Sequence, residues 1–225
     1  MFLKNPIQAK LYLNLPNGVK VQVFFHCCPH SLVNCYVIGS EPSDLHKTER
    51  RDAVVVDPAF IDTAILKFIE DNNLNLRGIL ITHDHINHTR GLRTFKRIYD
   101  VEVYAMNHIV QDQKCIVIRD MDILYVGPFR FEVISIPGHS LDSAVFKIEQ
   151  LLFTGDVITA GLVGWTMSAY GSTTQMNALR SKILSLPGDF TILPGHGPPS
   201  SLEAERRFNA GIQVYDQVRS GKKYS

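Results

Sequence analysis

The chain has few cysteines, almost no net charge and no long apolar run at its start. None of the four cysteines forms a Cys-x-x-Cys pair. Cysteines this sparse are not those of a secreted disulfide scaffold, so we expect reduced thiols. The formal net charge of +1 does not indicate a nucleic acid, an anionic membrane or an acidic partner.

The absence of an apolar run at the start of the sequence bears on where in the cell the protein is found. Residues 1–18 mix Lys4, Asn5, Pro6 and Lys10 with their apolar residues. A signal peptide or a membrane span needs a continuous apolar stretch, so we expect a cytoplasmic protein. With 225 residues, 45% hydrophobic and 20% charged, the chain fits one globular domain over 1–225.

The most informative segment is Thr82-His83-Asp84-His85-Ile86-Asn87-His88. It places three of the nine histidines within six residues, where the apolar strand predicted for 78–82 ends. His83 and His85 project from one tight turn, and the next helix can begin near His88. Three neutral imidazoles therefore come within reach of one divalent ion, and the segment predicts a metal site.

Three later segments share one pattern, an apolar strand, a turn with glycine and then a possible metal ligand. They are Ser135-Ile136-Pro137-Gly138-His139-Ser140, Leu151-Leu152-Phe153-Thr154-Gly155-Asp156 and Ile192-Leu193-Pro194-Gly195-His196-Gly197. A strand end holds such a side chain rigidly and exposes it to a cleft. Taken singly, each of these side chains is better explained as a polar residue at a strand end that hydrogen-bonds to the backbone. The whole set together favours one shared metal centre.

Hydrophobic patterning predicts a mixed fold. Ile65, Phe68 and Ile69 recur at helical spacing, and Asp62 is positioned to cap that helix. Strand and helix patterns interleave, which is typical of an α/β or α+β layered fold. The predicted strands are 19–25, 34–39, 54–56, 78–82, 101–105, 129–136, 144–148, 151–154 and 191–193, and the predicted helices are 62–72, 91–99, 174–186 and 201–218. Residues 41–52 are expected to form a charged surface loop.

The order His-x-His-x-x-His, then Pro-Gly-His, then Gly-Asp, then a last histidine resembles the metallo-β-lactamase superfamily. Within it, Leu152-Phe153-Thr154-Gly155-Asp156 and Pro194-Gly195-His196-Gly197-Pro198, followed by residues 202–209, are similar to the single-domain members of the glyoxalase II branch. The resemblance covers most of the chain. It implies a four-layer αββα sandwich with metals at one edge.

The resemblance also implies a ligand set. Metal one would take His83, His85 and His139, and metal two would take His88 and His196, with Asp156 bridging both. Asn87 departs from the pattern, because the family usually has an aspartate there that ligates metal two. An amide offers an oxygen without charge, so we expect one tightly held Zn²⁺ and a second ion that is weak, conditional or absent. Fe²⁺ is the alternative metal.

A hydrolase of this kind acts through water bound to its metal. The metal lowers the pKa of that water toward about 7, and the resulting hydroxide attacks a thioester or ester carbonyl. A thiolate leaves without strong acid assistance, which suits a thioester. The candidate catalytic residues are Asp156, Asn87 and Asp57. Asp57 is expected to orient a ligand histidine, with a turn or helix-start acceptor as the alternative, and Asp84 is expected to point away from the metals.

Two features concern the substrate. Residues 161–167 occupy the stretch where the branch usually has Gly-Arg-Thr-Asp, so Trp165 and Met167 replace charged residues. The chain also ends before the C-terminal helical domain of the two-domain enzymes, which weakens the expectation of glutathione recognition. Trp165 and Met167 would suit an apolar substrate group, while packing in a core or lid is the alternative for Trp165.

The loop 25–30 and the segment 90–97 indicate a role at the metal site or in substrate binding only weakly. Cys27, Cys28 or His30 in the loop could approach the metal and offset the missing carboxylate, although adjacent cysteines are more often small buried side chains. A basic run consists of Arg90, Arg93, Lys96 and Arg97. We interpret it as a solvated helix face in preference to a surface that attracts an anionic substrate.

Three functions remain open from the sequence. The first is a metal-dependent, glyoxalase II-like hydrolase with a small-molecule substrate and neither a nucleic acid nor a membrane as partner. The second is a mononuclear iron oxygenase that resembles persulfide dioxygenases, with His83, His139 and Asp156 as its ligands. The third is a catalytically silent metal-binding domain. The sequence does not determine the oligomeric state.

Overall fold

The computed structural model describes residues 10–29, 31–41 and 50–219. One sheet has the strand order β1-β2-β3-β4-β5-β6-β9 and the other β10-β11-β12-β13-β16-β17. The first sheet consists of β1 (Lys10–Asn14), β2 (Lys20–Cys27), β3 (Asn34–Ser40), β4 (Arg51–Val56), β5 (Leu74–Leu80), β6 (Glu102–Ala105) and β9 (Ile116–Val117). The second consists of β10 (Ile123–Val126), β11 (Phe129–Ser135), β12 (Ala144–Ile148), β13 (Leu151–Gly155), β16 (Thr191–Pro194) and β17 (Ser200–Ser201).

Helices and two small hairpins complete the structure. The helices are α1 (Thr63–Asp71), α2 (Ile86–Thr89), α3 (Leu92–Ile98), α4 (Ala169–Leu179), a π-helix η1 (Arg180–Leu184), α5 (Leu202–Phe208) and α6 (Ala210–Arg219). The hairpins pair β7 (Ile109–Val110) with β8 (Gln113–Lys114), and β14 (Ile158–Thr159) with β15 (Leu162–Val163).

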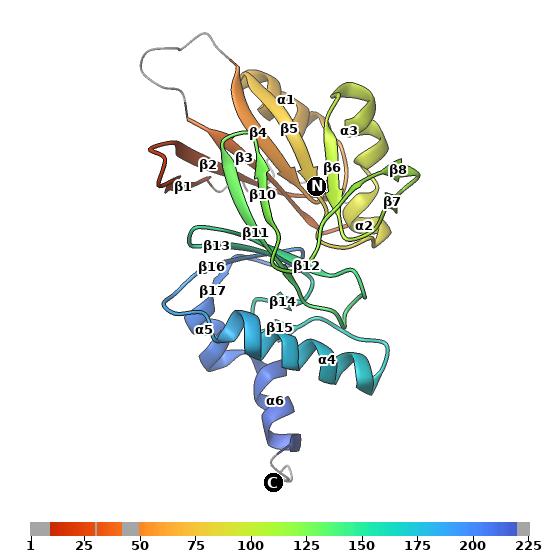
Figure 1. Cartoon of the computed structure of the whole chain (residues 1–225), viewed down its shortest axis with the longest axis vertical. Coiled ribbons are helices and arrows are strands. Elements are labelled where there is room, and N and C mark those ends of the chain that lie inside the picture. The colour runs from red at the N-terminus through yellow and green to blue at the C-terminus, as the bar shows by residue number, and fades with distance from the viewer. Residues whose placement is uncertain (1–9, 30, 42–49, 220–225) are drawn as a thin grey trace, which may run out of the picture.

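The two sheets are stacked between two sets of helices, as Figure 1 shows, with α1 and α3 beside the first sheet and α4 to α6 beside the second. Neighbouring residues of one strand enter different cores because side chains alternate across a sheet. Val55 packs under α1 and α3, whereas Val54 packs between the sheets. Phe153 likewise packs between the sheets, and Leu152 packs against the second set of helices. The predicted αββα sandwich is confirmed.

The candidate ligands lie where strands end. β4 and β6 flank β5 in parallel, and β16 runs parallel to β13, so the carboxyl ends of these strands meet at common edges. His83 and His85 follow β5, His139 follows β11, Asp156 follows β13 and His196 follows β16. The loops after parallel strands are where such folds place their sites.

The helix predicted for 62–72 agrees with α1, and Asp62 caps it by accepting hydrogen bonds from Ala64 N and Ile65 N, both at 3.0 Å. The continuous helix predicted for 201–218 is wrong. Asn209 is extended, with φ −67° and ψ 111°, and divides the segment into α5 and α6. Its buried amide donates to Glu205 and accepts from Ile212 N, so this side chain ends one helix and begins the next.

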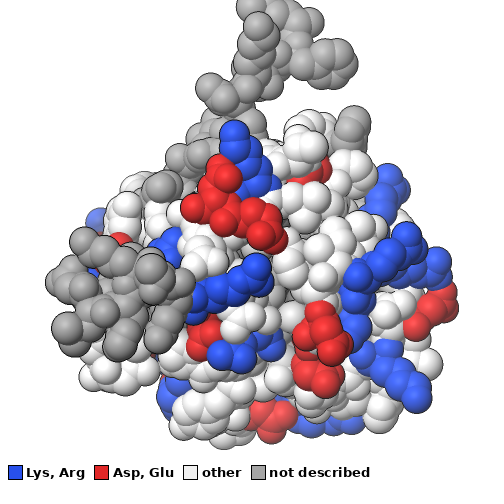
Figure 2. All heavy atoms as spheres, turned by 90° about the horizontal axis from the view of Figure 1, so that it is seen from above, with Lys and Arg blue, Asp and Glu red and all other residues white. Residues whose placement is uncertain are grey.

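Charges of both signs are interspersed on the face shown in Figure 2, where lysine and arginine side chains lie among aspartates and glutamates. Among the described residues, no helix combines the length and apolar character that crossing a membrane requires.

Replacing Phe153 with alanine should destabilise the protein strongly. Phe153 is fully buried between the sheets and meets Tyr36 edge-on, with ring centroids 5.2 Å apart. Its loss leaves a cavity, so we expect Phe153→Ala to lower the free energy of unfolding in urea by roughly 3 to 5 kcal/mol. Phe208→Ala is the matched control, because Phe208 is 72% exposed and should change stability by no more than about 0.5 kcal/mol. Equal effects would contradict this packing.

Candidate metal centre

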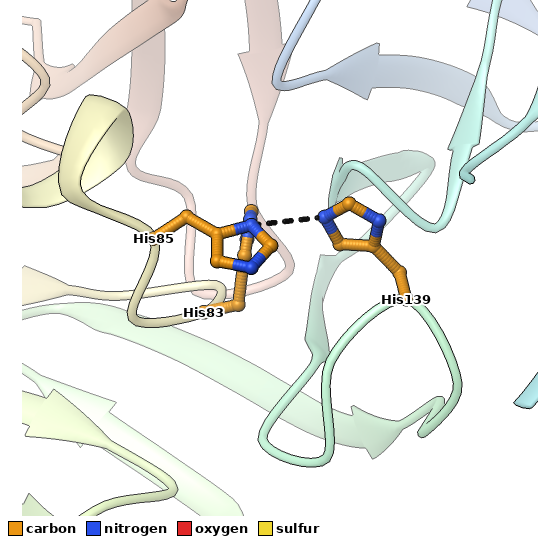
Figure 3. Close-up of side chains that lie close together, drawn as sticks. All are labelled: His83, His85 and His139. Atoms are coloured by element: carbon orange, nitrogen blue, oxygen red, sulfur yellow. Dashed lines mark hydrogen bonds between the residues drawn. The ribbon is translucent and has the colours of Figure 1, made fainter. Parts of the chain in front are cut away.

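Three histidines from two facing loops form the first possible metal site. The ligand nitrogens of His83, His85 and His139 lie within 4.8 Å of one another. Figure 3 shows His83 and His85 leaving one loop while His139 reaches toward them from another, and the dashed line joins His85 Nδ1 to His139 Nε2, 3.1 Å apart. The Nδ1 of His139 donates to the carbonyl of Trp165 at 2.7 Å, which fixes the ring and leaves Nε2 as the ligand atom.

A second group shares His83 and adds His88 and Asp156, again with ligand atoms within 4.8 Å. Asp156 Oδ2 lies 3.3 Å from His88 Nε2, 3.9 Å from His83 Nε2 and 3.7 Å from His139 Nε2. One carboxylate oxygen is therefore surrounded by three imidazole nitrogens. This position is suited to a bridge between the two groups.

These residues fit a divalent ion. His83 Nε2 and His88 Nε2 are buried side-chain atoms without a hydrogen-bond partner. Buried polar atoms are normally satisfied, so two unsatisfied imidazole nitrogens that face one carboxylate require an explanation. Imidazole nitrogen and carboxylate oxygen are the donors that zinc and iron(II) take in proteins. An ion at this position would satisfy both nitrogens.

Asp57 holds two of these histidines from behind. Its carboxylate accepts from Thr82 N at 2.8 Å, from the Thr82 hydroxyl at 2.6 Å and from His88 Nδ1 at 2.9 Å. Since the Thr82 hydroxyl gives its proton to Asp57, it can only accept from His83 Nδ1, 3.1 Å away. Both rings thus carry a proton on Nδ1 and direct Nε2 toward Asp156.

Burial and neighbouring charge set the protonation of the centre. Burial, with the nearby His88, lowers the pKa of His83 to about 2, and burial also lowers the pKa of His85. Burial opposes a charge on His88 too, but Asp57 and Asp156 outweigh it and raise the pKa of His88 to about 9. Burial alone would raise the pKa of Asp156, yet His196 and His88 hold it well below its usual range.

His196 and Asn87 lie together beside Asp156 and outside both groups. His196 Nδ1 pairs with Asp156 Oδ1 at 2.8 Å, and its Nε2 is 3.4 Å from Asn87 Nδ2. The structure therefore brings His196 to the carboxylate of Asp156, beside both groups. An amide at 87 adds no charge next to His196.

Sequence reasoning missed two residues that position the His196 loop. The buried Asn34 donates from its amide to the carbonyls of Pro194, at 2.9 Å, and Gly197, at 2.7 Å. Gly195 leaves space for the ligands, because a Cβ there would be 2.4 Å from both Asp156 Oδ1 and His88 Cε1. A single asparagine at the start of a strand has no pattern that would indicate such a role.

Other expected contributors lie elsewhere. Cys28 is fully buried in the core, with its sulfur 4.0 Å from the carbonyl of Phe60, and His30 lies outside the described residues. The backbone amide of Asp84 donates to the carboxylate of Asp142, and burial together with Asp142 raises the pKa of the Asp84 carboxyl group. In the basic run, Arg90, Arg93 and Arg97 are exposed, and Arg93 pairs with Asp112.

Comparison with known proteins identifies the family. The model of the metallo-beta-lactamase superfamily matches residues 29–114. A hydroxyacylglutathione hydrolase, GloC, of Haemophilus influenzae is 26% identical over 185 residues, which cover 72% of this chain and 87% of that protein. An uncharacterized protein of Mycobacterium tuberculosis is 30% identical over 214 residues, covering 80% of this chain and 92% of its own length. The chain belongs to the metallo-beta-lactamase superfamily.

Solved structures agree on the fold. The BLEG-1 B3 metallo-beta-lactamase superposes with a TM-score of 0.74 at 24% identity, covering 84% of this chain and 99% of that one. ETHE1 from Myxococcus xanthus superposes with a TM-score of 0.71 at 21% identity, covering 97% and 92%. At these identities the likeness concerns the architecture alone.

Replacing Asn87 with aspartate should create a stronger second metal site. The new carboxylate would stand beside His196 and the bridging Asp156. We expect elemental analysis to rise toward two ions per chain and the affinity for the second ion to increase at least about 10-fold. Asn177→Asp, on the exposed face of α4, is the control and should leave the metal content unchanged. Unchanged metal content in Asn87→Asp would contradict the role given to Asn87.

Replacing Asp57 with asparagine should alter His88 directly. In metal-free protein we expect the pKa of His88, followed by NMR, to fall from about 9 because an opposite charge is lost. The stability that His88 adds is complete below pH 6.5 and is lost as the pH rises through about 9, and this dependence should weaken in the variant. Metal affinity should fall about 10- to 100-fold. Asp57 has a positive φ of 51°, which asparagine tolerates.

The control for Asp57→Asn is Asp52→Asn, which removes a carboxylate from the opposite end of β4, where Asp52 pairs with Arg77. This variant should leave the pKa of His88 and the metal affinity unchanged. An unaltered His88 pKa in Asp57→Asn would show that the contact with Asp57 does not control this imidazole.

Proposed function

We propose that this protein is a metal-dependent hydrolase of the glyoxalase II type that cleaves a thioester or a related ester of a small molecule. The observation that carries the proposal is the convergence of His83, His88 and His139 on Asp156 Oδ2. Its support from relatives is the name hydroxyacylglutathione hydrolase, given to the Haemophilus influenzae protein.

The proposed ligands are His83, His85 and His139 for a tightly held ion and His88 and His196 for a weaker second one, with Asp156 bridging both. A divalent ion supplies a Lewis acid that acidifies bound water and polarises a carbonyl. Zn²⁺ suits this donor set, and Fe²⁺ is the alternative.

The chain's own residues prepare this chemistry. Asp57 and Thr82 fix the tautomers of His83 and His88, and the Trp165 carbonyl fixes that of His139. The backbone amide of Asp84 donates to the carboxylate of Asp142. A substrate whose leaving group departs as an anion suits such a site, and a thiolate does so without strong acid assistance.

A second candidate is an iron-dependent oxygenase. His83 Nε2 and His139 Nε2 lie 3.9 and 3.7 Å from Asp156 Oδ2, and two histidines with one carboxylate form a known iron(II) ligand set. The architecture of ETHE1 agrees with this alternative but does not favour it over the hydrolase.

Reconstitution of metal-free protein with Zn²⁺ or Fe²⁺ should separate the candidates. We expect the zinc form to release thiol from S-lactoylglutathione or from simple acyl thioesters, measured with a thiol reagent. His139→Ala should reduce kcat/KM at least about 100-fold, because it removes a ligand. His108→Ala is the matched control, since His108 is exposed and outside the centre.

Oxygen consumption on a persulfide by the iron form, without thioester cleavage, would replace the hydrolase with the oxygenase. Inactivity of both loaded forms would favour a silent metal-binding domain.

A further inference from the structure

One segment beside the metal centre has no charged side chain. From Val157 to Leu179 the sequence contains no Lys, Arg, Asp, Glu or His. The same segment exposes four large side chains, of which Trp165, Met167 and Tyr170 are the most exposed, at 73%, 86% and 82%, and Leu162 is 58% exposed. Leu141, two residues after His139, is 92% exposed. We call Leu141, Trp165, Met167 and Tyr170 the apolar rim.

The apolar rim adjoins the proposed ligands. The carbonyl of Trp165 accepts the hydrogen bond from His139 Nδ1 at 2.7 Å. The loop that carries His139 also packs closely on the start of α4, because a Cβ on Gly138 would be 2.6 Å from the carbonyl of Gly171. Both loops of the rim therefore meet at a metal ligand, although they are distant in sequence.

The backbone that carries the rim is held in place by three polar side chains, two of which are buried. Glu205 is 2% exposed, and its two oxygens accept from Gly161 N at 3.1 Å each. Gln175 donates to the carbonyls of Val157 and Gly164, both at 3.1 Å. Ser168 caps α4 through Gly171 N at 3.0 Å. The large apolar side chains thus project from a backbone fixed at several points, which lowers the ordering cost of binding a ligand.

We propose that the apolar rim binds an uncharged hydrocarbon group attached near the scissile carbonyl, so that the substrates are apolar acyl or alkyl thioesters. This inference rests on the proposed function. Exposed apolar side chains next to a site gain about 25 cal/mol per Å² when a ligand covers them. Glutathione carries carboxylates and an ammonium group, and residues 157–179 offer no charge to pair with them.

Trp165 provides a direct test because it is the only tryptophan of the chain. The zinc-loaded and the metal-free protein are titrated with non-hydrolysable thioethers of N-acetylcysteamine bearing ethyl, hexyl or decyl groups. We expect a blue shift of the Trp165 emission and a Kd that falls with chain length, by up to about 4-fold for each fully buried methylene. S-methylglutathione should bind weakly.

Kinetics on the zinc-loaded protein identify which side of the thioester the rim contacts. One series lengthens the acyl group on N-acetylcysteamine, and the other lengthens the thiol of an acetyl thioester. Met167→Ala should lower kcat/KM for the long member of one series several-fold more than it lowers kcat/KM for the acetyl thioester of N-acetylcysteamine. Met121→Ala is the matched control, because Met121 is 83% exposed and lies just before β10.

The outcomes separate the rim from the hydrolase. Turnover of S-lactoylglutathione with no effect of chain length in either series would overturn the proposed role of the rim. The proposal that the protein is a hydrolase would stand. A length-dependent shift of Trp165 without any thioester turnover would support the binding and reject the hydrolase. A shift caused by raising the protein concentration, or by phosphatidylcholine vesicles, without a response to the thioethers would assign the rim to another copy or a membrane and overturn the proposal.

Discussion

The structure depends on one partly buried carboxylate, that of Asp156, which is surrounded by imidazoles. His83, His88 and His139 face Asp156 Oδ2 at 3.3 to 3.9 Å, and His196 pairs with Oδ1 at 2.8 Å. Unsatisfied nitrogens in such a place are costly, so neighbouring residues must hold the rings in position. Asp57 and Asn34 do so from the first sheet. The centre therefore connects the ends of both sheets.

The parts that hold the ligands and the parts that face a substrate obey different constraints. Ligand loops follow buried strands, and little can change there without moving a nitrogen or an oxygen by a fraction of a bond length. Gly195 illustrates the constraint, because a Cβ there would collide with Asp156 and His88. Trp165 contacts the centre through its backbone carbonyl, so its exposed side chain is free to differ from those of related proteins.

Local sequence patterns predicted much of the architecture. They failed where a tertiary contact determines where a helix ends. The apolar repeat and the cap at Asp62 gave α1 to within a residue at each end. The same type of pattern predicted one helix over 201–218, yet Asn209 breaks it, because its buried amide is bonded to Glu205. That carboxylate in turn also accepts from Gly161 on a different element. No periodicity in the sequence could have indicated such a contact.

The sequence by itself determined the types of candidate ligand and the strand ends that they follow, because histidines after apolar strands and glycine turns are local features. It also determined that residue 87 is an amide. The tertiary structure alone decided that His83 and His88 share Asp57, and that His196 pairs with Asp156 while Cys28 is buried in the core. These contacts depend on the distances between segments that are remote in the chain. Only the packing of the two sheets determines those distances.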